Sequence, residues 1–458
     1  MLPPPLPAVV LTTAETRLAY VLRHFQQDYE AVPSVSIGYR SVQPQVEIAA
    51  VDHGFFTGIA PYPAAPTYRE WQGQQLPFFF DDQPTRPLLE LLPNSRARIN
   101  ADVISAAFYL LSGWQEFYSE ERDQHGRFPY TASVQHRYGF VAVPVVNYYF
   151  DVLKTAVEHV TGQPLQPRRW ADGATWATFI THDIDNLYSA WKEPTRAALS
   201  QGKALEFGRM LWRHFTKKDA WDNLELVQQT VAEYGAKSTF FFLPENRKAA
   251  NGTPNADYNI RREWPKLAAT IGNSEIGLHV SIGAPYHAHL KREEHRLQHL
   301  RNGVKAYGVR FHYLQWEPRI TPVILGALLY KYDSTLGFAE HYGFRNSYCL
   351  PFYPYDFAQN KACYFLEIPL NVMDATLHHP RYLQLAPEEI LPSLTPMFQE
   401  IERFGGVCTV LWHNDNFDPA NIRNGPREFR AIMEYLRSRN PAFVNGQDIC
   451  AQMSPPSS

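Results

Sequence analysis

Short apolar segments alternate with amphipathic ones along most of this chain, and that alternation restricts the fold more than any other feature. The run Lys237-Ser-Thr-Phe-Phe-Phe-Leu is typical of a buried strand, and residues 224–234 before it repeat apolar side chains at helical spacing. Strand, helix and strand repeated in this way favour parallel strands with helices packed outside them. We count about seven such strands. The sequence therefore predicts an α/β fold, an irregular (β/α) barrel over residues 174–450.

The length of 458 residues exceeds what one ordinary core accommodates, so the sequence predicts two domains. Residues 1–165 lack the regular alternation and are expected to form a smaller α+β domain of unknown role. Its clearest helices are expected at residues 13–25 and 102–122, where apolar side chains recur at helical spacing. Residues 161–173 contain two prolines and are interpreted as the linker.

One polar cluster stands out in the first domain. Asp123, His125 and Arg127 lie in the segment Asp123-Gln-His-Gly-Arg-Phe-Pro, whose Gly and Pro indicate a turn. We interpret these three residues as a hydrogen-bonded turn, with a functional site as the alternative. The first domain shows no other pattern typical of a metal site or a nucleophile.

Charge and hydropathy exclude several classes of partner. The net charge is −3 and the pI is about 6.6, so no basic field is available to hold nucleic acid. No polybasic tract indicates a membrane surface, and no apolar run approaches the roughly 20 residues of a spanning helix. The proline-rich start lacks the charged and apolar regions of a signal peptide, and the four cysteines include no Cys-x-x-Cys pair. We therefore expect a cytoplasmic enzyme with reduced thiols, without a nucleic acid or membrane partner.

The segment Phe179-Ile-Thr-His-Asp-Ile-Asp185 runs from an apolar strand into two carboxylates. Asp183 and Asp185 are two positions apart, a spacing that puts both side chains on one face of a strand. Holding two negative charges together is costly unless a cation or a proton compensates them. A metal ion bound to one carboxylate leaves the other available as a base. The alternative is a strand that ends in an Asp-rich loop with solvated or capping carboxylates.

Polar side chains recur where the predicted strands end. In β/α folds the carboxyl ends of parallel strands meet at one face, where functional sites form. Arg310 and His312 share a face of the strand expected at residues 309–314, and Asp374 ends the strand expected at residues 365–374. The side chains expected to meet are Asp183, Asp185, His279, Arg310, His312, Asp374 and His413.

From residue 175 to residue 416, the chain resembles the polysaccharide deacetylases, carbohydrate esterase family four. The motifs that carry the resemblance are Thr181-His-Asp-Ile-Asp185, Gly235-Ala-Lys-Ser-Thr-Phe-Phe-Phe, Glu275-Ile-Gly-Leu-His279, Val309-Arg310 and Val410-Leu-Trp-His413. They stand in the family's order, each on or beside a predicted strand. Residues 186–222, rich in Trp, Arg and Lys, have no counterpart in the simplest members and are interpreted as an insertion beside the site. The first domain resembles an uncharacterised module found before such domains in bacterial proteins, which implies no activity.

The resemblance implies a role for each matching residue. In the family, the first Asp of the leading motif is the general base and the second binds the metal, which carries over to Asp183 and Asp185. His279 matches a metal ligand of the family. Arg310 matches the residue that orients the base, and His413 matches the general acid.

One metal ligand of the family has no counterpart at its usual place. Gly283 stands where the family usually has a second His, four residues after His279. His312 is the preferred substitute, because it is expected to share a face with Arg310 on a neighbouring strand. The alternatives are His287, eight residues after His279, and a site without a third ligand.

The expected donor set of one carboxylate and two imidazoles favours Zn²⁺ among the divalent metals, with a coordination position left open for water. The expected ligands are Asp185, His279 and His312. Asp183 would take a proton from that water, and His413 would protonate the leaving amine. Asp374 is inferred to orient His413, with a bond to a backbone amide as the alternative. Asp415 is interpreted as part of a turn, with substrate contact as the alternative.

Three functions are compatible with these residues. The leading hypothesis is metal-dependent hydrolysis of an N-acetyl group on an amino sugar of a glycan or glycan precursor. The second is hydrolysis of a different non-peptide amide. The third is a catalytically inactive carbohydrate-binding relative, which the missing second His favours. The expected partner is a carbohydrate or glycan-precursor substrate, and the sequence does not identify any partner protein.

Overall fold

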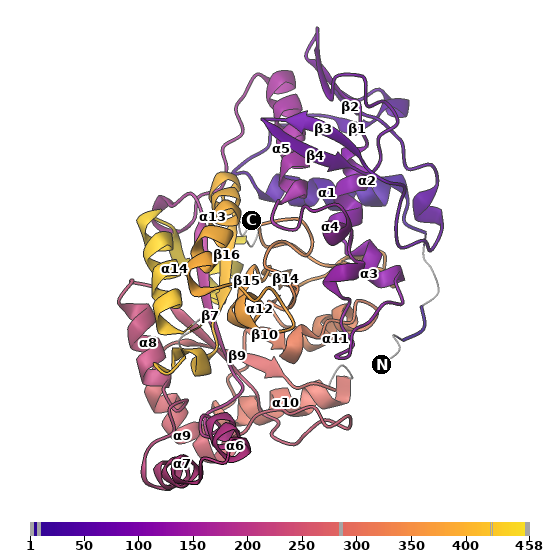
Figure 1. Cartoon of the computed structure of the whole chain (residues 1–458). Coiled ribbons are helices and arrows are strands. Elements are labelled where there is room, and N and C mark those ends of the chain that lie inside the picture. The colour runs from indigo at the N-terminus through magenta and orange to yellow at the C-terminus, as the bar shows by residue number, and fades with distance from the viewer. Residues whose placement is uncertain (1–3, 7–10, 284–286, 422, 424, 454–458) are drawn as a thin grey trace.

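The computed structural model of the chain describes residues 4–6, 11–283, 287–421, 423 and 425–453 (Figure 1). A mixed module of helices and strands lies in the upper part of the view, and a sheet surrounded by helices lies below it. Much of the proline-rich start lies outside the described residues, and so does the side chain of His287. Among the helices that are described, none is both long and apolar enough to cross a bilayer.

The first module is a small α+β domain, as predicted. Its strands are β1 (Ile37–Tyr39), β2 (Val46–Ile48), β3 (Thr67–Trp71), β4 (Gln74–Phe78), β5 (Leu89–Leu92) and β6 (Arg96–Ile99). Its helices are α1 (Ala14–Gln27), α2 (Val103–Leu111), α3 (Trp114–Tyr118), α4 (Val134–Arg137) and α5 (Val145–Thr161). One sheet has the order β1-β2-β6-β5, and β3 and β4 form a separate hairpin. Helix α5 packs on β2, β5 and β6, while α1 packs on α2.

The single helix expected over residues 102–122 is broken into two, and residues 119–122 are not helical. Asp102 caps α2 by accepting a hydrogen bond from a backbone N–H at 2.9 Å, but the helix ends at Leu111. Gly113 has a φ of 70°, a left-handed conformation that interrupts the helix, and α3 begins directly after it. Both helices bury their apolar side chains in the same core, so the apolar periodicity continues across the break.

The second domain is built on a parallel sheet that curls into an irregular barrel. Its strands are β7 (Ala177–Ile184), β8 (Ser238–Phe242), β9 (Glu275–Val280), β10 (Gly308–Phe311), β11 (Tyr332–Asp333), β14 (Leu366–Glu367), β15 (Val372–Met373), β16 (Val407–Leu411) and β17 (Ala442–Val444). Their order is β14-β11-β10-β9-β8-β7-β16-β15, β17 also pairs with β7, and every pairing is parallel. The predicted α/β class and irregular (β/α) barrel are confirmed, with nine strands in the described sheet.

Helices cover the outside of this sheet. They are α8 (Leu224–Ala232), α9 (Ile260–Ile271), α10 (His287–Leu300), α11 (Thr321–Leu328), α12 (Asp374–His378), α13 (Pro387–Phe404), α14 (Pro426–Ser438) and α15 (Gly446–Met453). The segment interpreted as an insertion forms a helical pair, α6 (Lys192–Ser200) and α7 (Ala204–Thr216), at the lower edge of Figure 1.

Two of the strands expected to carry site residues are shorter than predicted. Strand β10 stops one residue before His312, which opens a 3-10 turn. Tyr313 and Leu314 have φ values of 58° and 55°, left-handed conformations that an extended strand cannot contain. The strand expected over residues 365–374 is split into β14 and β15, and Asp374 is the first residue of α12.

The two domains share a buried interface. The guanidinium of Arg345 pairs with the carboxylate of Glu116 at 2.6 Å, and both side chains are almost fully buried. Arg319 donates a hydrogen bond to the backbone carbonyl of Phe117 at 2.8 Å, and Gln135 donates to the carbonyl of Arg345 at 2.6 Å. Charges buried in this way are tolerated only when they are paired, so these contacts favour one arrangement of the domains. The boundary expected between the domains stays a prediction.

Candidate metal centre

Strand β7 brings the paired carboxylates to the carboxyl end of the sheet. All eight residues of β7 are buried, and Asp183 keeps only 2% of its surface exposed. Asp185 follows β7 directly and is partly exposed. Because β7 lies between β8 and β16, its carboxyl end is surrounded by the ends of other strands.

A fully buried arginine holds Asp183 in place. Nη1 of Arg310 donates to Oδ1 of Asp183 at 3.0 Å and to Oγ1 of Thr181 at 2.8 Å. Its Nε and Nη2 donate to the carbonyl and hydroxyl oxygens of Ser334 at 2.7 and 2.9 Å. The guanidinium carbon also lies 4.5 Å from the centre of the Phe241 ring, a cation–π contact. These contacts fix the guanidinium, and through it Asp183, in one orientation.

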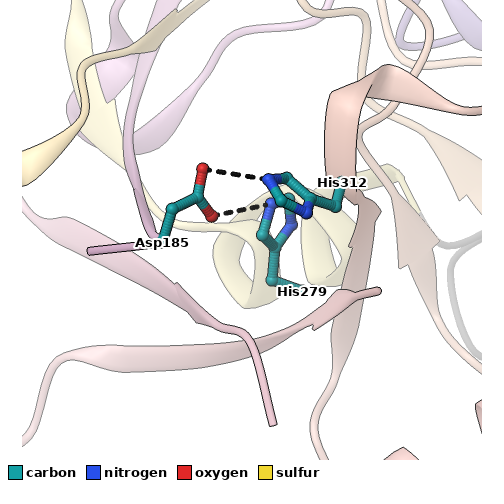
Figure 2. A group of neighbouring side chains, drawn as sticks. All are labelled: Asp185, His279 and His312. Carbon is teal, nitrogen blue, oxygen red and sulfur yellow. Dashed lines mark ion pairs between the residues drawn. The ribbon is translucent and has the colours of Figure 1, made fainter. Parts of the chain in front are cut away.

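Asp185, His279 and His312 converge beside this pair (Figure 2). Nε2 of His279 lies 3.3 Å from Oδ1 of Asp185, and Nε2 of His312 lies 3.2 Å from Oδ2 of the same carboxylate. Each residue offers a ligand atom, and these atoms all lie within 4.8 Å of one another. Zinc ligands stand about 2.0–2.2 Å from the ion, so three atoms this close together can share one ion after small side-chain adjustments.

Hydrogen bonds on the far side of each imidazole indicate its tautomer. Nδ1 of His279 lies 2.9 Å from the carbonyl oxygen of Arg310, which can only accept, so Nδ1 carries a proton. Nδ1 of His312 lies 3.4 Å from Oδ1 of Asn255, which likewise accepts. In the neutral imidazoles, Nε2 therefore presents a lone pair to Asp185.

Lone pairs that face a carboxylate need a positive charge between them. Nε2 of His279 and Oδ1 of Asp185 are buried, and neither has a hydrogen-bond partner among the described residues. Burial alone would raise the pKa of Asp185, but His312 and His279 in their protonated forms outweigh burial and hold that pKa well below its usual range. A proton or a metal cation can supply this charge, and one carboxylate with two imidazoles is a typical zinc donor set. The residues present therefore fit a divalent metal.

A histidine–aspartate pair also reaches Asp185. Nδ1 of His413 donates to Oδ1 of Asp374 at 2.7 Å, and the backbone N–H of His413 donates to Oδ2 at 2.6 Å. Nε2 of His413 lies 3.8 Å from Oδ2 of Asp185. Burial alone would lower the pKa of His413, but Asp374 outweighs burial and raises that pKa well above its usual range. The sequence offers two alternatives for Asp374, a bond to the His413 ring and a bond to a backbone amide. Its carboxylate makes both bonds.

Asp415, two residues after His413, is a further carboxylate near this pair. It lies in a 3-10 turn, Asn414–Phe417, in agreement with the turn expected there. Burial raises the pKa of Asp415 to about 7, although the charge of His413 acts in the opposite direction. Its buried Oδ1 has no hydrogen-bond partner among the described residues.

Contacts link the seven residues that the sequence analysis expects to meet, which are Asp183, Asp185, His279, Arg310, His312, Asp374 and His413. The alternative third ligand, His287, has a side chain outside the described residues. Ser334 and Asn255, which hold Arg310 and His312, are not singled out from the sequence. Ser334 directly follows β11, so its place at a strand end is a usable signal, whereas Asn255 lies outside any strand or helix and no local pattern points to it.

Comparison with known proteins gives one family and a set of distant structures. Residues 9–162 match a family of unknown function (DUF7033), and no curated protein matches the chain. A protein from Mycobacterium smegmatis, provisionally described as a polysaccharide deacetylase, is 18% identical over 65% of this chain and 97% of its own, with a TM-score of 0.42. A similarly described protein from Pseudomonas aeruginosa PAO1 is 16% identical over 63% of this chain and 94% of its own, with a TM-score of 0.41. The Puue allantoinase is 14% identical over 63% of this chain and 93% of its own, with a TM-score of 0.40. Identities this low leave the function to be decided by the side chains of the site.

Proposed function

We propose that this protein is a metal-dependent amide hydrolase that removes an N-acetyl group from an amino sugar of a glycan or glycan precursor. One observation carries the proposal. The ligand atoms of Asp185, His279 and His312 gather within 4.8 Å of one another, and both the Asp183–Arg310 pair and the Asp374–His413 pair contact this group. A metal donor set flanked by a carboxylate and an imidazole that are each held by a buried partner is well suited to the hydrolysis of an amide.

The donor set supports Zn²⁺ first among divalent metals. A zinc ion held by Asp185, His279 and His312 would polarise the amide carbonyl and make a water molecule acidic enough to lose its proton near neutral pH. The hydrogen bonds of the imidazoles support this assignment, since each imidazole has an acceptor at Nδ1 and so directs Nε2 toward the ion.

Asp183 is the proposed general base. Oδ1 of Asp183 is bound by Arg310, whereas Oδ2 lies 3.7 Å from Nε2 of His279 and so faces the metal ligands. A water molecule between the ligands and Oδ2 could pass its proton to Asp183. Arg310 supports this role because it keeps the carboxylate from turning away.

His413 is the proposed general acid, which protonates the nitrogen of the leaving amine. Oδ1 of Asp374 accepts a hydrogen bond from the protonated Nδ1 of His413. Nε2 of His413 is therefore the ring atom that faces Asp185, beside the metal ligands. The raised pKa of His413, caused by Asp374 against the effect of burial, keeps the imidazole protonated at neutral pH. A protonated imidazole at this place can give a proton to the amine as the carbon–nitrogen bond breaks.

Acetate release tests the proposal. Zinc-loaded protein is incubated with N-acetylated amino sugars and short glycans, and acetate is measured for the wild type and for Asp183→Asn. We expect release by the wild type and a loss of about 10²-fold or more in the variant. Equal release by both proteins would remove Asp183 from the mechanism. A panel of other acyl amides, assayed in parallel, separates an N-acetyl hydrolase from a hydrolase of a different amide.

A binding protein without activity is the second candidate. Gly283 stands where a His would be the usual third metal ligand, so that ligand has to come from a different loop. This departure favours a binding protein without activity. Metal analysis separates the two candidates: purified protein that holds no metal and ignores added zinc, yet binds sugars, would support binding without catalysis.

A further inference from the structure

The turn at residues 123–127 of the first domain lies against the loop that carries His312. The rings of His125 and Tyr313 stack with centres 4.6 Å apart and 13° between their planes, and the Tyr313 ring lies 4.2 Å from that of His312. Nη1 of Arg127 donates to the backbone carbonyl of Tyr313 at 3.0 Å. The first domain therefore touches the residue that follows an expected metal ligand.

Asp123 organises this turn and aims Arg127 at the loop. Oδ1 of Asp123 accepts from the backbone N–H groups of His125 and Arg127 at 2.8 and 2.9 Å, and Oδ2 accepts from Nε of Arg127 at 2.7 Å. Gly126 has a φ of 78°, which favours glycine, and a Cβ there would lie 3.2 Å from Nε2 of Gln315. The guanidinium is buried between the turn and the loop, so its orientation is fixed from the first domain.

The loop that receives Arg127 adopts a backbone conformation that its residues disfavour. Tyr313 and Leu314 both have left-handed φ values, and such conformations persist where surrounding contacts impose them. Arg127 holds the carbonyl of Tyr313, and His125 covers its ring. Because His312 directly precedes Tyr313, a shift of the Tyr313 backbone would turn the imidazole of His312 away from the other ligands.

We propose that Arg127 is a positioning residue of the metal centre, supplied by the first domain, and that His125 assists it by stacking on Tyr313. This proposal rests on the proposed function, because it assumes that His312 binds the metal. In this proposal, the first domain holds the third metal ligand, His312 of the second domain, in place.

The test measures metal affinity and ligand geometry. Metal-free full-length chain is titrated with Zn²⁺ against a chromophoric chelator, and with Co²⁺, whose absorption spectrum reports the geometry of the ligands. We expect Arg127→Met to bind Zn²⁺ about tenfold more weakly than the wild type and to change the Co²⁺ spectrum, as substitutions of residues that orient metal ligands do. Arg127→Lys should recover part of the affinity, since it restores a donor to the Tyr313 carbonyl.

Arg122→Met is the matched control. Arg122 belongs to the same domain, its side chain is also buried, and it pairs with Glu317 across the interface at 3.1 Å. We expect its Zn²⁺ affinity to stay within about twofold of the wild type, because it holds no ligand in place. If Arg127→Met does not fold, His125→Ala is measured in its place, because it keeps the backbone hydrogen bonds of the turn. We expect its Zn²⁺ affinity to fall about threefold.

Two outcomes count against the proposal and can be told apart. Equal Zn²⁺ affinity and equal Co²⁺ spectra in the wild type and in Arg127→Met would overturn the positioning role and leave the proposed function intact. A wild type that binds neither metal would overturn the proposed function, and the positioning role with it.

A second observation, independent of the metal centre, concerns the helices α6 and α7 at the lower edge of Figure 1. None of the 13 residues of α7, all of which the structure describes, is buried. Leu205, Trp212 and Phe215 recur at helical spacing and are 92%, 61% and 76% exposed, and Leu199 of α6 is 64% exposed. We call Leu205, Trp212 and Phe215, which share one side of α7, the apolar face. A face of this kind marks a contact surface.

Basic side chains accompany the apolar face. Residues 192–218 contain seven Lys or Arg and two Glu, although the whole chain has a net charge of −3. Arg209 lies four residues after Leu205, and Arg213 lies next to Trp212, so both arginines border the face. Exposed apolar side chains bordered by cations are typical of helices that lie on anionic lipid. The sequence-based expectation of no membrane partner rests on the absence of a polybasic tract, whereas these cations are dispersed over residues 192–218.

We infer that α6 and α7 dock on an anionic lipid surface, with the apolar face in the headgroup region and the cations on the lipid charges. The test is co-sedimentation of the full-length chain with phosphatidylcholine vesicles, with and without phosphatidylglycerol. We expect the chain to pellet with the anionic vesicles only, to be released by high salt, and to lose binding about fivefold or more in Trp212→Asp/Phe215→Asp.

Tyr364→Asp is the matched control, because Tyr364 is 79% exposed and lies outside the helical pair. It should bind as the wild type does. Equal pelleting of the wild type and Trp212→Asp/Phe215→Asp would overturn the docking surface, and so would the absence of pelleting with anionic vesicles. Equal pelleting with neutral vesicles would overturn the assignment to anionic lipid.

Discussion

Asp374 holds His413 at two points, the ring Nδ1–H at 2.7 Å and the backbone N–H at 2.6 Å. The first contact determines which ring nitrogen carries the proton, and the second fixes the main chain from which the ring projects. Asn416 also donates to Oδ2 of Asp374 at 2.7 Å, so the carboxylate itself has little freedom. The orientation of His413 therefore depends on one buried carboxylate, which also makes the largest contribution to raising the pKa of this histidine.

Replacing that carboxylate should change the pH dependence of hydrolysis. Asp374 raises the pKa of His413, so in Asp374→Asn this pKa falls toward its ordinary value and the acid loses its proton at lower pH. The alkaline limb of the kcat profile should move to lower pH, with activity above neutral pH reduced about 10²-fold or more. Asp418→Asn, a nearby carboxylate without contact to His413 in the described structure, serves as the control. An unchanged alkaline limb in Asp374→Asn would exclude His413 as the acid.

Removing the cation beside the proposed base should destabilise the fold. Arg310→Met leaves Asp183 buried without its ion-pair partner, which costs about 3–5 kcal/mol in the free energy of unfolding. Urea midpoints measure this loss. The double variant Arg310→Met/Asp183→Asn should lose less than the sum of the two single variants, because the uncompensated charge is gone. Additive losses would show that Arg310 does not compensate Asp183.

Metal binding should stabilise the protein, and the effect identifies the third ligand. Zinc at about 100 times its Kd should stabilise the metal-free wild type by about 2.7 kcal/mol, seen as a higher Tm. His312→Ala should lose most of this gain, whereas His287→Ala should keep it. The reverse result would make His287 the third ligand, and a wild type without any gain would argue against a metal centre.

Replacing two glycines of the barrel with alanine should change the stability of the fold in opposite directions. A Cβ on Gly308 would lie 1.9 Å from the ring of Tyr332, so Gly308→Ala should destabilise the fold by about 1–3 kcal/mol or more. A Cβ on Gly326, inside α11, meets no heavy atom within 4 Å. Gly326→Ala should therefore stabilise by about 0.5–1 kcal/mol, through helix propensity alone. Thermal unfolding of both variants checks the register of β10 against β11, and a neutral Gly308→Ala would contradict it.

The class of the fold follows from local patterns. Parallel strands buried on both faces need continuous apolar runs such as that of β8, and these runs alternate with amphipathic helices along the chain. The same regularity brings Asp183, Asp185 and His279 together, because the carboxyl ends of parallel strands meet at one face. Strands as short as β11 and β14, two residues each, leave no such pattern, so their lengths are not predictable from it.

The order of apolar and polar residues by itself determined the α/β class and placed two carboxylates and an imidazole at one end of the sheet. Only the tertiary structure decided the contacts among the site residues and the residues that hold them in place. The register of β9 and β10 pairs His279 with Arg310, which brings His312 near Asp185, and Arg127 reaches Tyr313 from 186 positions away. Strands β9 and β10 are almost entirely buried, so they lack the contrast between a buried and an exposed face that can specify register, and domain packing arises from contacts between distant segments.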